Sequence, residues 1–196
     1  MKLRKKTRCE LGIFRTGREK SIPLYTYPEE GECSMIRLRA AHVRGGPLRL
    51  CAETGMRREM LLLGGSLVVD EGDGPRFVHD RVTCADGAYL DAFGLAYELE
   101  LESRADCGTA LAILEPEDGQ TVCQTVDGLT VKLVYGLRGV TRLIGPGGAS
   151  VTLEPGDLAL LYPECADETV ALMGVDCRCA VVDLTAPEEN EAVAVG

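Results

Sequence analysis

Apolar and polar residues alternate with a period of two in several parts of this chain, and that period is typical of β-strands. The clearest example is residues 97–102, where three apolar side chains alternate with three glutamates (Tyr97, Leu99 and Leu101; Glu98, Glu100 and Glu102). Because side chains alternate between the two faces of a strand, this segment is predicted to be half-buried, with its glutamates turned away from the core. No segment of helical length is amphipathic.

About a dozen short strand-like runs are separated by glycine-rich turn signals, which favours an all-β sandwich or barrel. A weak internal repeat relates the runs after Met60 to those after Leu133: each copy has an apolar strand, a glycine, a second strand, a tight turn and a returning strand. The second copy ends in Leu153–Leu160, whose Glu-Pro-Gly-Asp sequence looks like the turn that closes a cupin barrel. The chain is therefore predicted to be a bicupin, two fused cupin-like double-stranded β-barrels.

Four regions are expected. Residues 1–20 would form a basic arm, residues 21–106 the first barrel, residues 107–185 the second barrel, and residues 186–196 a frayed polar tail. The arm carries eight basic and two acidic side chains, a net charge of +6, which leaves −16 on the rest of a chain whose net charge is −10. The acidic body would repel nucleic acid and anionic membranes, so neither is expected as a partner, although the basic arm could touch either.

The chain shows no signal-peptide pattern and no apolar run of about 20 residues, so a cytoplasmic protein is expected. In that reducing compartment the nine cysteines, none of which forms a CxxC pair, are expected to be free thiols. Cys177 and Cys179 would place two thiols on one face of a strand, which leaves a metal or redox role as an alternative.

Only two histidines are present, His42 and His79, and neither belongs to an H-x-H pair. A metal-binding cupin needs about three histidines and a carboxylate in one barrel, so no metal and no cofactor are expected. A catalytic thiol beside a histidine is an open alternative, with Cys51 and Cys84 as candidates. No serine lies in a G-x-S-x-G motif, and no catalytic residue is assigned.

The stretch Tyr25–Phe93 resembles the HutD/Ves family of duplicated cupin-like barrels. At the places of that family's motifs the chain reads Leu24-Tyr-Thr-Tyr-Pro-Glu29, Ile36-Arg-Leu-Arg-Ala-Ala-His-Val43, Gly55, Arg58-Glu-Met-Leu-Leu-Leu-Gly-Gly65 and Asp91-Ala-Phe-Gly94. The spacing holds without gaps from Ile36 to Gly65. The family is linked to histidine utilisation and stress, so the resemblance implies a HutD-like bicupin with a small-molecule binding or regulatory role.

The chain also departs from the family's pattern. The family's W-x-N-G-G-x-T-x-E segment has no counterpart in Thr16–Pro23, and its tryptophan is replaced by Ile36. Its F-[ST] pair reads Leu50-Cys51, and its D-F-N segment is missing around Cys107–Leu111. This looks like a divergent member, in which the scaffold is expected to carry over better than the ligand chemistry.

An arginine cluster is the strongest candidate for a binding site. Six of the thirteen basic residues beyond residue 20 lie between Arg37 and Arg58, opposed there only by Glu53. The resemblance places Arg37 and Arg58 at arginines of the two family motifs; Arg39 would share the strand face of Arg37, and Phe93 would add an apolar wall. Arginine binds carboxylate or phosphate through a planar fork, so an interior face would make an anion pocket. On an exterior face, the arginines would instead pair with the glutamates of residues 97–102.

The leading hypothesis is a non-enzymatic, metal-free protein that binds a small anionic metabolite, a carboxylate, through Arg37 and Arg58, with a regulatory role in histidine utilisation. Two alternatives stay open. One is a metal-independent isomerase or hydrolase that uses His42 or a cysteine, and the other is a structural oligomer without a ligand. A homodimer formed through edge strands is compatible with each of these.

Overall fold

The computed structural model describes residues 1–16, 19–28, 35–51, 54–70, 74–84, 89–165 and 167–185. It divides the chain into two units: an N-terminal unit, Thr7–Ala105, and a C-terminal unit, which consists of Asp106–Gly196 together with Met1–Lys6. The division falls between Ala105 and Asp106, and residues 1–20 are split between the two units rather than forming one segment. The predicted tail, residues 186–196, lies outside the described residues.

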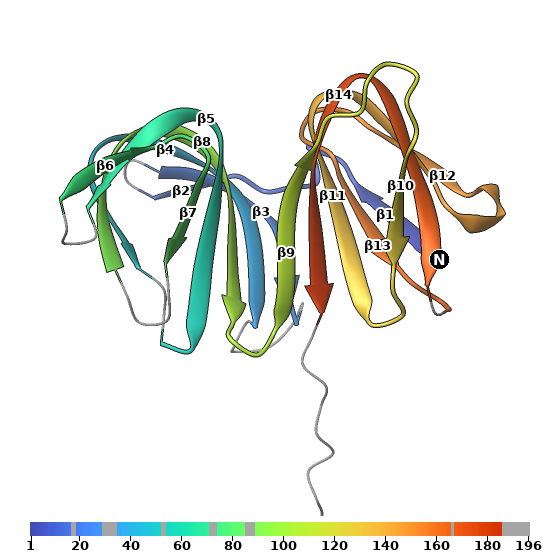
Figure 1. Ribbon diagram of the computed structural model, residues 1–196, viewed down its shortest axis with the longest axis horizontal. Coiled ribbons are helices and arrows are strands. Elements are labelled where there is room, and N and C mark those ends of the chain that lie inside the picture. Colours follow the sequence, from blue (N-terminus) through green and yellow to red (C-terminus); the bar gives the residue numbers. More distant parts are fainter. Residues whose placement is uncertain are drawn as a thin grey trace, which may run out of the picture. The chain divides into compact units, whose positions relative to one another are not determined.

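The N-terminal unit is built from strands that form one antiparallel sheet (Figure 1). Its strands are β2 (Phe14–Thr16), β3 (Glu19–Tyr27), β4 (Ile36–Cys51), β5 (Met56–Asp70), β6 (Pro75–Val78), β7 (Arg81–Cys84) and β8 (Tyr89–Arg104). They pair in the order β2-β3-β4-β8-β5-β6, and β7 also pairs with β5. The long strand β8 therefore lies between β4 and β5, and this pairing positions the candidate site.

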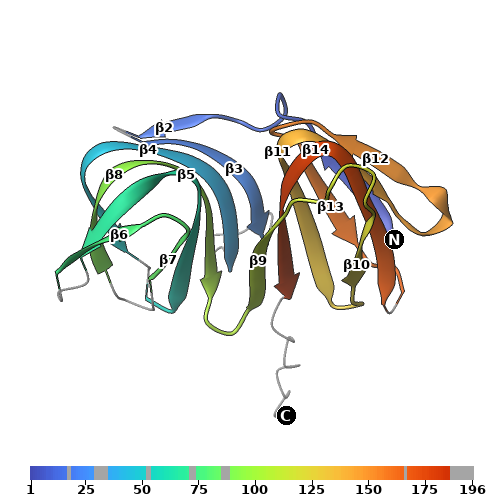
Figure 2. The same cartoon turned by 45° about the horizontal axis from the view of Figure 1, so that its top comes forward.

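The C-terminal unit repeats this plan with a second antiparallel sheet. Its strands are β1 (Lys2–Lys6), β9 (Gly108–Leu114), β10 (Val122–Val126), β11 (Thr130–Ile144), β12 (Ser150–Leu153), β13 (Leu158–Tyr162) and β14 (Glu168–Thr185), with a short 3-10 turn, η1 (Pro146–Gly148). The order is β1-β13-β11-β14-β10, with β12 on β11 and β9 on β14. The long strands of each unit are visibly curved (Figure 2).

Each curved sheet carries an apolar cluster on one face. In the N-terminal unit this core face includes Met60 and Leu62 of β5 and Val82 of β7, and in the C-terminal unit it includes Val134 of β11 and Val181 of β14. The predicted all-β class is confirmed. Within the described residues each pairing path is open at its ends, so the closed barrel that we expected is not seen.

One glycine pair among the predicted turn signals is in fact part of a bulge inside a long strand. Gly64-Gly65 lies within β5, where the register against β8 shifts between Leu62 and Gly64. A side chain at Gly65 would overlap the carbonyl oxygen of Leu95, and Gly65 has a φ of +85°. Glycine is the residue that permits such a close approach and such a φ, so the two glycines mark a bend rather than a chain reversal.

The basic arm is also different from the prediction. Residues 2–6 form β1, which pairs antiparallel with β13. The Lys5 ammonium lies 2.6 Å from the Asp157 carboxylate and donates to the Thr152 carbonyl at 2.7 Å. The carboxylates of Glu164 and Glu168 accept hydrogen bonds from the Met1 amine and raise its pKa. The positive charges of Met1 and Lys5 are thus paired with carboxylates of the C-terminal unit.

The turn predicted to close a cupin barrel is present at residues 154–157. The Asp157 carboxylate accepts a hydrogen bond from the Glu154 amide at 3.0 Å, and the Asp157 amide donates back to the Glu154 carbonyl at 3.0 Å. Gly156 and Asp157 also exchange backbone hydrogen bonds with Gly136 of β11. Within the described part of the chain, no helix is long and apolar enough to cross a membrane.

Candidate functional site

Three of the predicted site residues converge on the glutamates of β8. Arg39 of β4 lies opposite Glu100 in register and donates to it at 2.9 Å. Arg58 of β5 reaches the same carboxylate from the other side at 2.7 Å. Arg37 pairs with Glu102, two residues further along β8, at 2.9 Å. Because β8 lies between β4 and β5, each neighbouring strand supplies an arginine to its acidic face.

This network lies on the core face of the N-terminal sheet. Directly opposed residues of paired strands point to the same side, and Glu100 is opposed by Met60, which belongs to the apolar cluster. Glu100 is 0 % exposed and Glu98 is 1 % exposed. The sequence-based placement of these two glutamates in solvent was therefore wrong. The physical reason is that arginines from flanking strands allow the Glu100 carboxylate to be buried.

A hollow of about 240 Å³ opens beside the network and is lined by Arg37, Arg39, Glu100 and Glu102. The side chains of Arg37 and Arg39 are 37 % and 31 % exposed, so both are partly accessible to solvent, although the Nε atom of each is buried. Arg58 does not line the hollow. Its side chain is 10 % exposed, and it pairs with the Glu100 carboxylate from the β5 side. The sequence left two alternatives for the arginines, an interior pocket or pairing with the glutamates. In the structure Arg37 and Arg39 pair with glutamates and also line a hollow on the core face.

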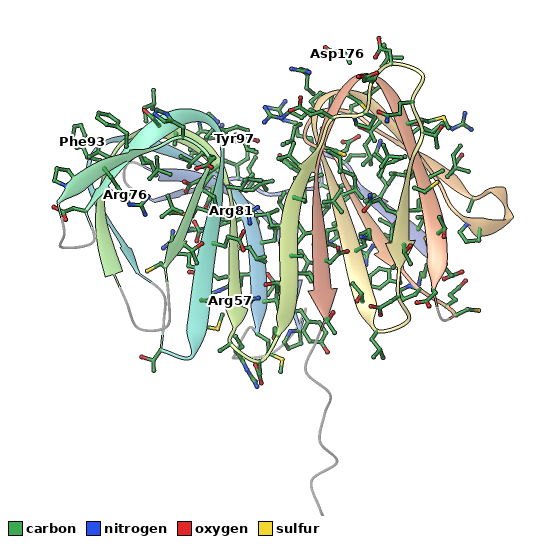
Figure 3. The ribbon with its side chains drawn as sticks, viewed as in Figure 1. Arg57, Arg76, Arg81, Phe93, Tyr97 and Asp176 are labelled. Atoms are coloured by element: carbon green, nitrogen blue, oxygen red, sulfur yellow. The ribbon has the colours of Figure 1, made fainter. Side chains whose placement is uncertain are left out.

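Phe93 does not join this network. Phe93 and Glu100 are an odd number of residues apart on β8, so their side chains point to opposite sides of the sheet. Seven residues of extended strand also separate the two, which is about 23 Å at 3.3 Å per residue. Phe93 is 57 % exposed and lies at an edge of the N-terminal unit (Figure 3). The prediction that Phe93 forms an apolar wall beside the arginines is not met, because its side chain lies on the other face of β8.

Of the other three arginines of the cluster, only Arg57 has a side chain within the described residues. Arg57 donates to the Ser103 hydroxyl at 3.1 Å, on the face opposite Glu100. The side chains of Arg44 and Arg49 lie outside the described residues. Among the described side chains, three arginines of the predicted cluster of six lie at the site.

Both histidines are exposed side chains. The His42 ring lies 4.6 Å from the Tyr97 ring, and His79 stacks on Phe77 at 6.3 Å between ring centroids. The enzyme alternative gave a catalytic role to His42 or a cysteine, and neither histidine lies in the core. Cys84 is buried opposite Arg58, and the Cys51 side chain lies outside the described residues. Among the described residues, no group of three or more histidine, cysteine or acidic side chains is arranged to hold a metal ion.

The described cysteines divide into two classes by exposure. Cys9, Cys123 and Cys165 are exposed free thiols, whereas Cys177 and Cys179 are buried in the C-terminal unit. Burial, together with a smaller effect of the neighbouring Cys177, raises the pKa of the Cys179 thiol to about 12. The thiolate is the reactive form, so Cys179 is expected to be inert at neutral pH.

Peptide mapping after iodoacetamide treatment of the folded protein at pH 8 should therefore find rapid modification at Cys9, Cys123 and Cys165. Cys179 should stay unmodified until denaturant is added, because its thiol is both buried and protonated. Denatured protein is the control, in which all of these cysteines should react. Rapid modification of Cys179 in the folded protein would contradict the described burial.

Sequence reasoning missed a second polar hollow, in the C-terminal unit, to which Asp127, Thr130, Asp183 and Thr185 contribute. A signal was available. Lys132 and Asp183 are single charges of opposite sign within two otherwise apolar strand-like runs. Such residues tend to be paired when they are buried, so their partnership could have been suspected from the sequence.

Comparison with known proteins gives the fold a wider context. No family model matches the chain, and no curated protein matches it in sequence. Among solved structures, a conserved protein of unknown function from Pseudomonas aeruginosa matches with a TM-score of 0.80 and 15% identity, over 95% of this chain and 100% of that chain. HutD from Pseudomonas fluorescens, obtained in a formate condition, matches with a TM-score of 0.76 and 14% identity, over 94% and 98% of the two chains.

A cupin 2 conserved barrel domain protein from Leptotrichia buccalis matches with a TM-score of 0.55 and 9% identity, over 93% of this chain and 96% of that chain. At these identities the likeness establishes a shared fold. The resemblance inferred from residues 25–93 is therefore confirmed at the level of the fold, and it extends over both units. The fold is that of a cupin-like, HutD-type protein.

Proposed function

We propose that this chain is a divergent HutD-like protein that binds a small carboxylate in its N-terminal unit without a metal, and that binding serves a regulatory role in amino-acid utilisation, including that of histidine. The observation that carries the proposal is a pair of arginines, Arg37 and Arg39, whose side chains are 37 % and 31 % exposed and which line the hollow of about 240 Å³. Arginine is the side chain best suited to recognise a planar carboxylate.

The charged side chains that line the hollow balance, with Arg37 and Arg39 opposed by Glu100 and Glu102, so the hollow has no net positive charge. Arg58 and Glu98 lie on the same face of the sheet without lining the hollow. A ligand would therefore use the guanidinium N–H groups that face the solvent, while Glu100 keeps Arg39 and Arg58 in place. Arg58 acts as a positioning residue in this arrangement, and Arg37 and Arg39 make the contact.

Thermal unfolding with a panel of formate, acetate, succinate, glutamate and histidine tests the proposal. A carboxylate that binds the folded state raises the unfolding temperature by mass action, and Arg37→Gln should weaken its binding at least about tenfold, because a charge-assisted hydrogen bond is lost. Stabilisation by histidine or glutamate in preference to the other acids would support the role in amino-acid utilisation.

Arg81→Gln is the matched control. Arg81 pairs with Glu59 at 2.9 Å with comparable exposure, 47 % and 18 %, but on the opposite face of the same sheet. It should leave carboxylate binding unchanged. If no carboxylate stabilises the protein, or if Arg37→Gln and Arg81→Gln behave alike, the proposed site is wrong.

A further inference from the structure

The buried ion pair of the N-terminal unit has an equivalent in the C-terminal unit. β5 and β11 are both 15 residues long, and the third residue of each is a buried basic residue, Arg58 and Lys132. Each lies beside a carboxylate on the next strand of its sheet. Arg58 bonds Glu100 of β8 at 2.7 Å, and Lys132 bonds Asp183 of β14 at 2.5 Å. The internal repeat thus extends from strand order to a charged pair on the core face.

A hollow of about 410 Å³ lies beside the second pair, as one does beside the first. Lys132, Asp183 and Ala110 are opposed in register across β11, β14 and β9, and Thr130, Thr185 and Gly108 form the next rung. Residues two apart on a strand share a face, so both rungs point to the same side. Gly108 and Ala110 have little or no side chain, which leaves space in front of Asp183, and this volume suits a small organic molecule.

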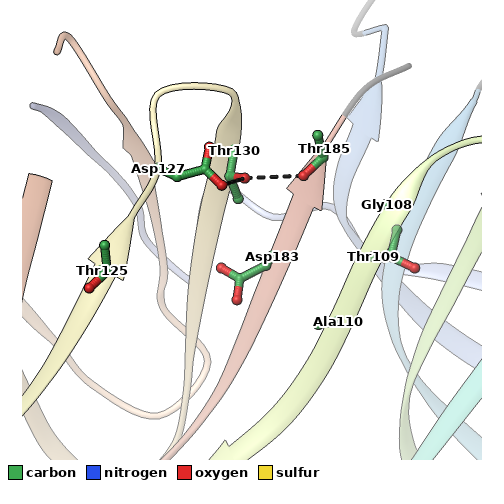
Figure 4. A pocket seen from close by; sticks show the side chains of 8 residues that line it. All are labelled: Gly108, Thr109, Ala110, Thr125, Asp127, Thr130, Asp183 and Thr185. Atoms are coloured by element: carbon green, nitrogen blue, oxygen red, sulfur yellow. Dashed lines mark hydrogen bonds between the residues drawn. The ribbon is translucent and has the colours of Figure 1, made fainter. Parts of the chain in front are cut away.

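The polar side chains that line this hollow are two carboxylates and four threonine hydroxyls. The Thr130 hydroxyl donates to the Asp127 carboxylate at 3.0 Å, so in its 3.1 Å contact with Thr185 it is the acceptor and Thr185 is the donor. The oxygen lone pairs of Thr185 are then available to a ligand. Figure 4 shows Asp127, Thr130 and Thr185 in a row with Asp183 beside them.

The charged side chains that are exposed at this hollow are negative, which also favours a positively charged ligand. The Lys132 side chain is 4 % exposed and its ammonium contacts Asp183, whereas the Asp183 side chain is 39 % exposed. Asp127 is also exposed. A molecule that enters the hollow therefore meets carboxylates and hydroxyl oxygens, with the positive charge held behind them. This is the reverse of the N-terminal hollow, where arginines are the exposed charges.

We propose that the C-terminal unit binds a small organic amine at this site, with the ligand's ammonium donating to the Asp183 carboxylate and the Thr185 hydroxyl. The two repeats would then have diverged to recognise ligand groups of opposite charge on equivalent parts of the same fold. The proposal does not depend on carboxylate binding by the N-terminal unit.

Isothermal titration calorimetry with putrescine and ethanolamine tests the amine, and butanediol provides a probe of the same shape as putrescine without the charge. The amines should bind at least about tenfold more tightly than the diol, because a hydrogen bond between charged groups is stronger than one between neutral groups. Equal binding of putrescine and butanediol would overturn the proposal, and so would the absence of any heat from either amine at millimolar concentration.

Two variants locate the site. Asp183→Asn removes the carboxylate charge and should weaken amine binding at least about tenfold. Because this change also leaves Lys132 without its ionic partner, Ala110→Leu is used beside it: the larger side chain fills the hollow and keeps the ion pair. Both variants should lose amine binding while urea unfolding shows that Ala110→Leu remains folded.

Glu117→Gln is the charge-matched control, since Glu117 is exposed and does not line the hollow. It should bind amines as the parent protein does, and so should Arg37→Gln. Unchanged amine affinity in both Asp183→Asn and Ala110→Leu would place binding elsewhere and overturn the proposal. Loss of carboxylate binding in Arg37→Gln with amine binding retained would separate the two sites.

Discussion

Glu100→Ala is expected to destabilise the N-terminal unit by about 3–5 kcal/mol, because it removes the carboxylate that neutralises a buried charge. Glu100 is fully buried and accepts hydrogen bonds from Arg39 and Arg58, and the Arg58 side chain is itself 10 % exposed. Without Glu100 the Arg58 guanidinium stays in the core with no compensating anion at that position. Urea unfolding at neutral pH, followed by circular dichroism, measures the change in the free energy of unfolding.

Glu102→Ala is the control for this experiment. The Glu102 side chain is 15 % exposed and that of its partner Arg37 is 37 % exposed, so solvent compensates most of the lost pairing and the cost should stay near 1 kcal/mol. A cost for Glu100→Ala as small as that for Glu102→Ala would contradict the buried network.

Glu100→Ala also allows a test of rescue by an added anion. The space left by the Glu100 carboxylate would be bordered by the guanidinium groups of Arg39 and Arg58, which could take up formate or acetate from solution. Added formate should therefore restore stability to Glu100→Ala in a concentration-dependent way and have less effect on Glu102→Ala. Equal effects of formate on the two variants would show that the anion does not enter the space.

Gly136→Ala is expected to destabilise the C-terminal unit by about 3 kcal/mol, because there is no room for one additional carbon atom. A Cβ at Gly136 would lie 2.5 Å from the carbonyl oxygen of Glu154 and 3.3 Å from its carbonyl carbon. These are backbone atoms of the turn at residues 154–157, and the Gly136 amide and carbonyl are hydrogen-bonded to that turn. Relief would require the strand and the turn to separate.

Gly64→Ala is the matched control, since it is another strand glycine without a positive φ and no atom lies within 4 Å of the Cβ that it would acquire. It should be neutral or stabilising by up to about 1 kcal/mol, since alanine lowers the entropy of the unfolded chain. Thermal and urea unfolding of the two variants measure the difference. Equal stability of Gly136→Ala and Gly64→Ala would contradict the close contact at the turn.

Much of the local architecture could be predicted from the sequence. The alternation around Leu99 and Leu101 predicted the strand β8, and the Glu-Pro-Gly-Asp sequence predicted the turn at residues 154–157. These features depend on side-chain alternation and on the turn preferences of a few neighbouring residues, both of which are written in short stretches of chain. Strand ends were less predictable, because a glycine pair such as Gly64-Gly65 can mark either a turn or a bulge.

Only the basic half of the site could be predicted from the sequence. The sequence singled out Arg37, Arg39 and Arg58, since basic residues clustered in an acidic chain are a compositional signal that needs no structure. It did not predict that Glu100 would be buried between them. Alternation separates the two faces of a strand, but it does not say whether the polar face is covered.

By itself, the sequence determined the all-β class, the repeated plan and the scarcity of histidines. The tertiary structure decided which charges meet: Arg39 and Glu100 are 61 residues apart, and Arg58 and Glu100 are 42 residues apart. Lys132 and Asp183 likewise come together only because β11 pairs with β14. The physical reason is that strand formation follows from local preferences, whereas the choice of a distant pairing partner depends on the whole sheet and on the burial that it achieves.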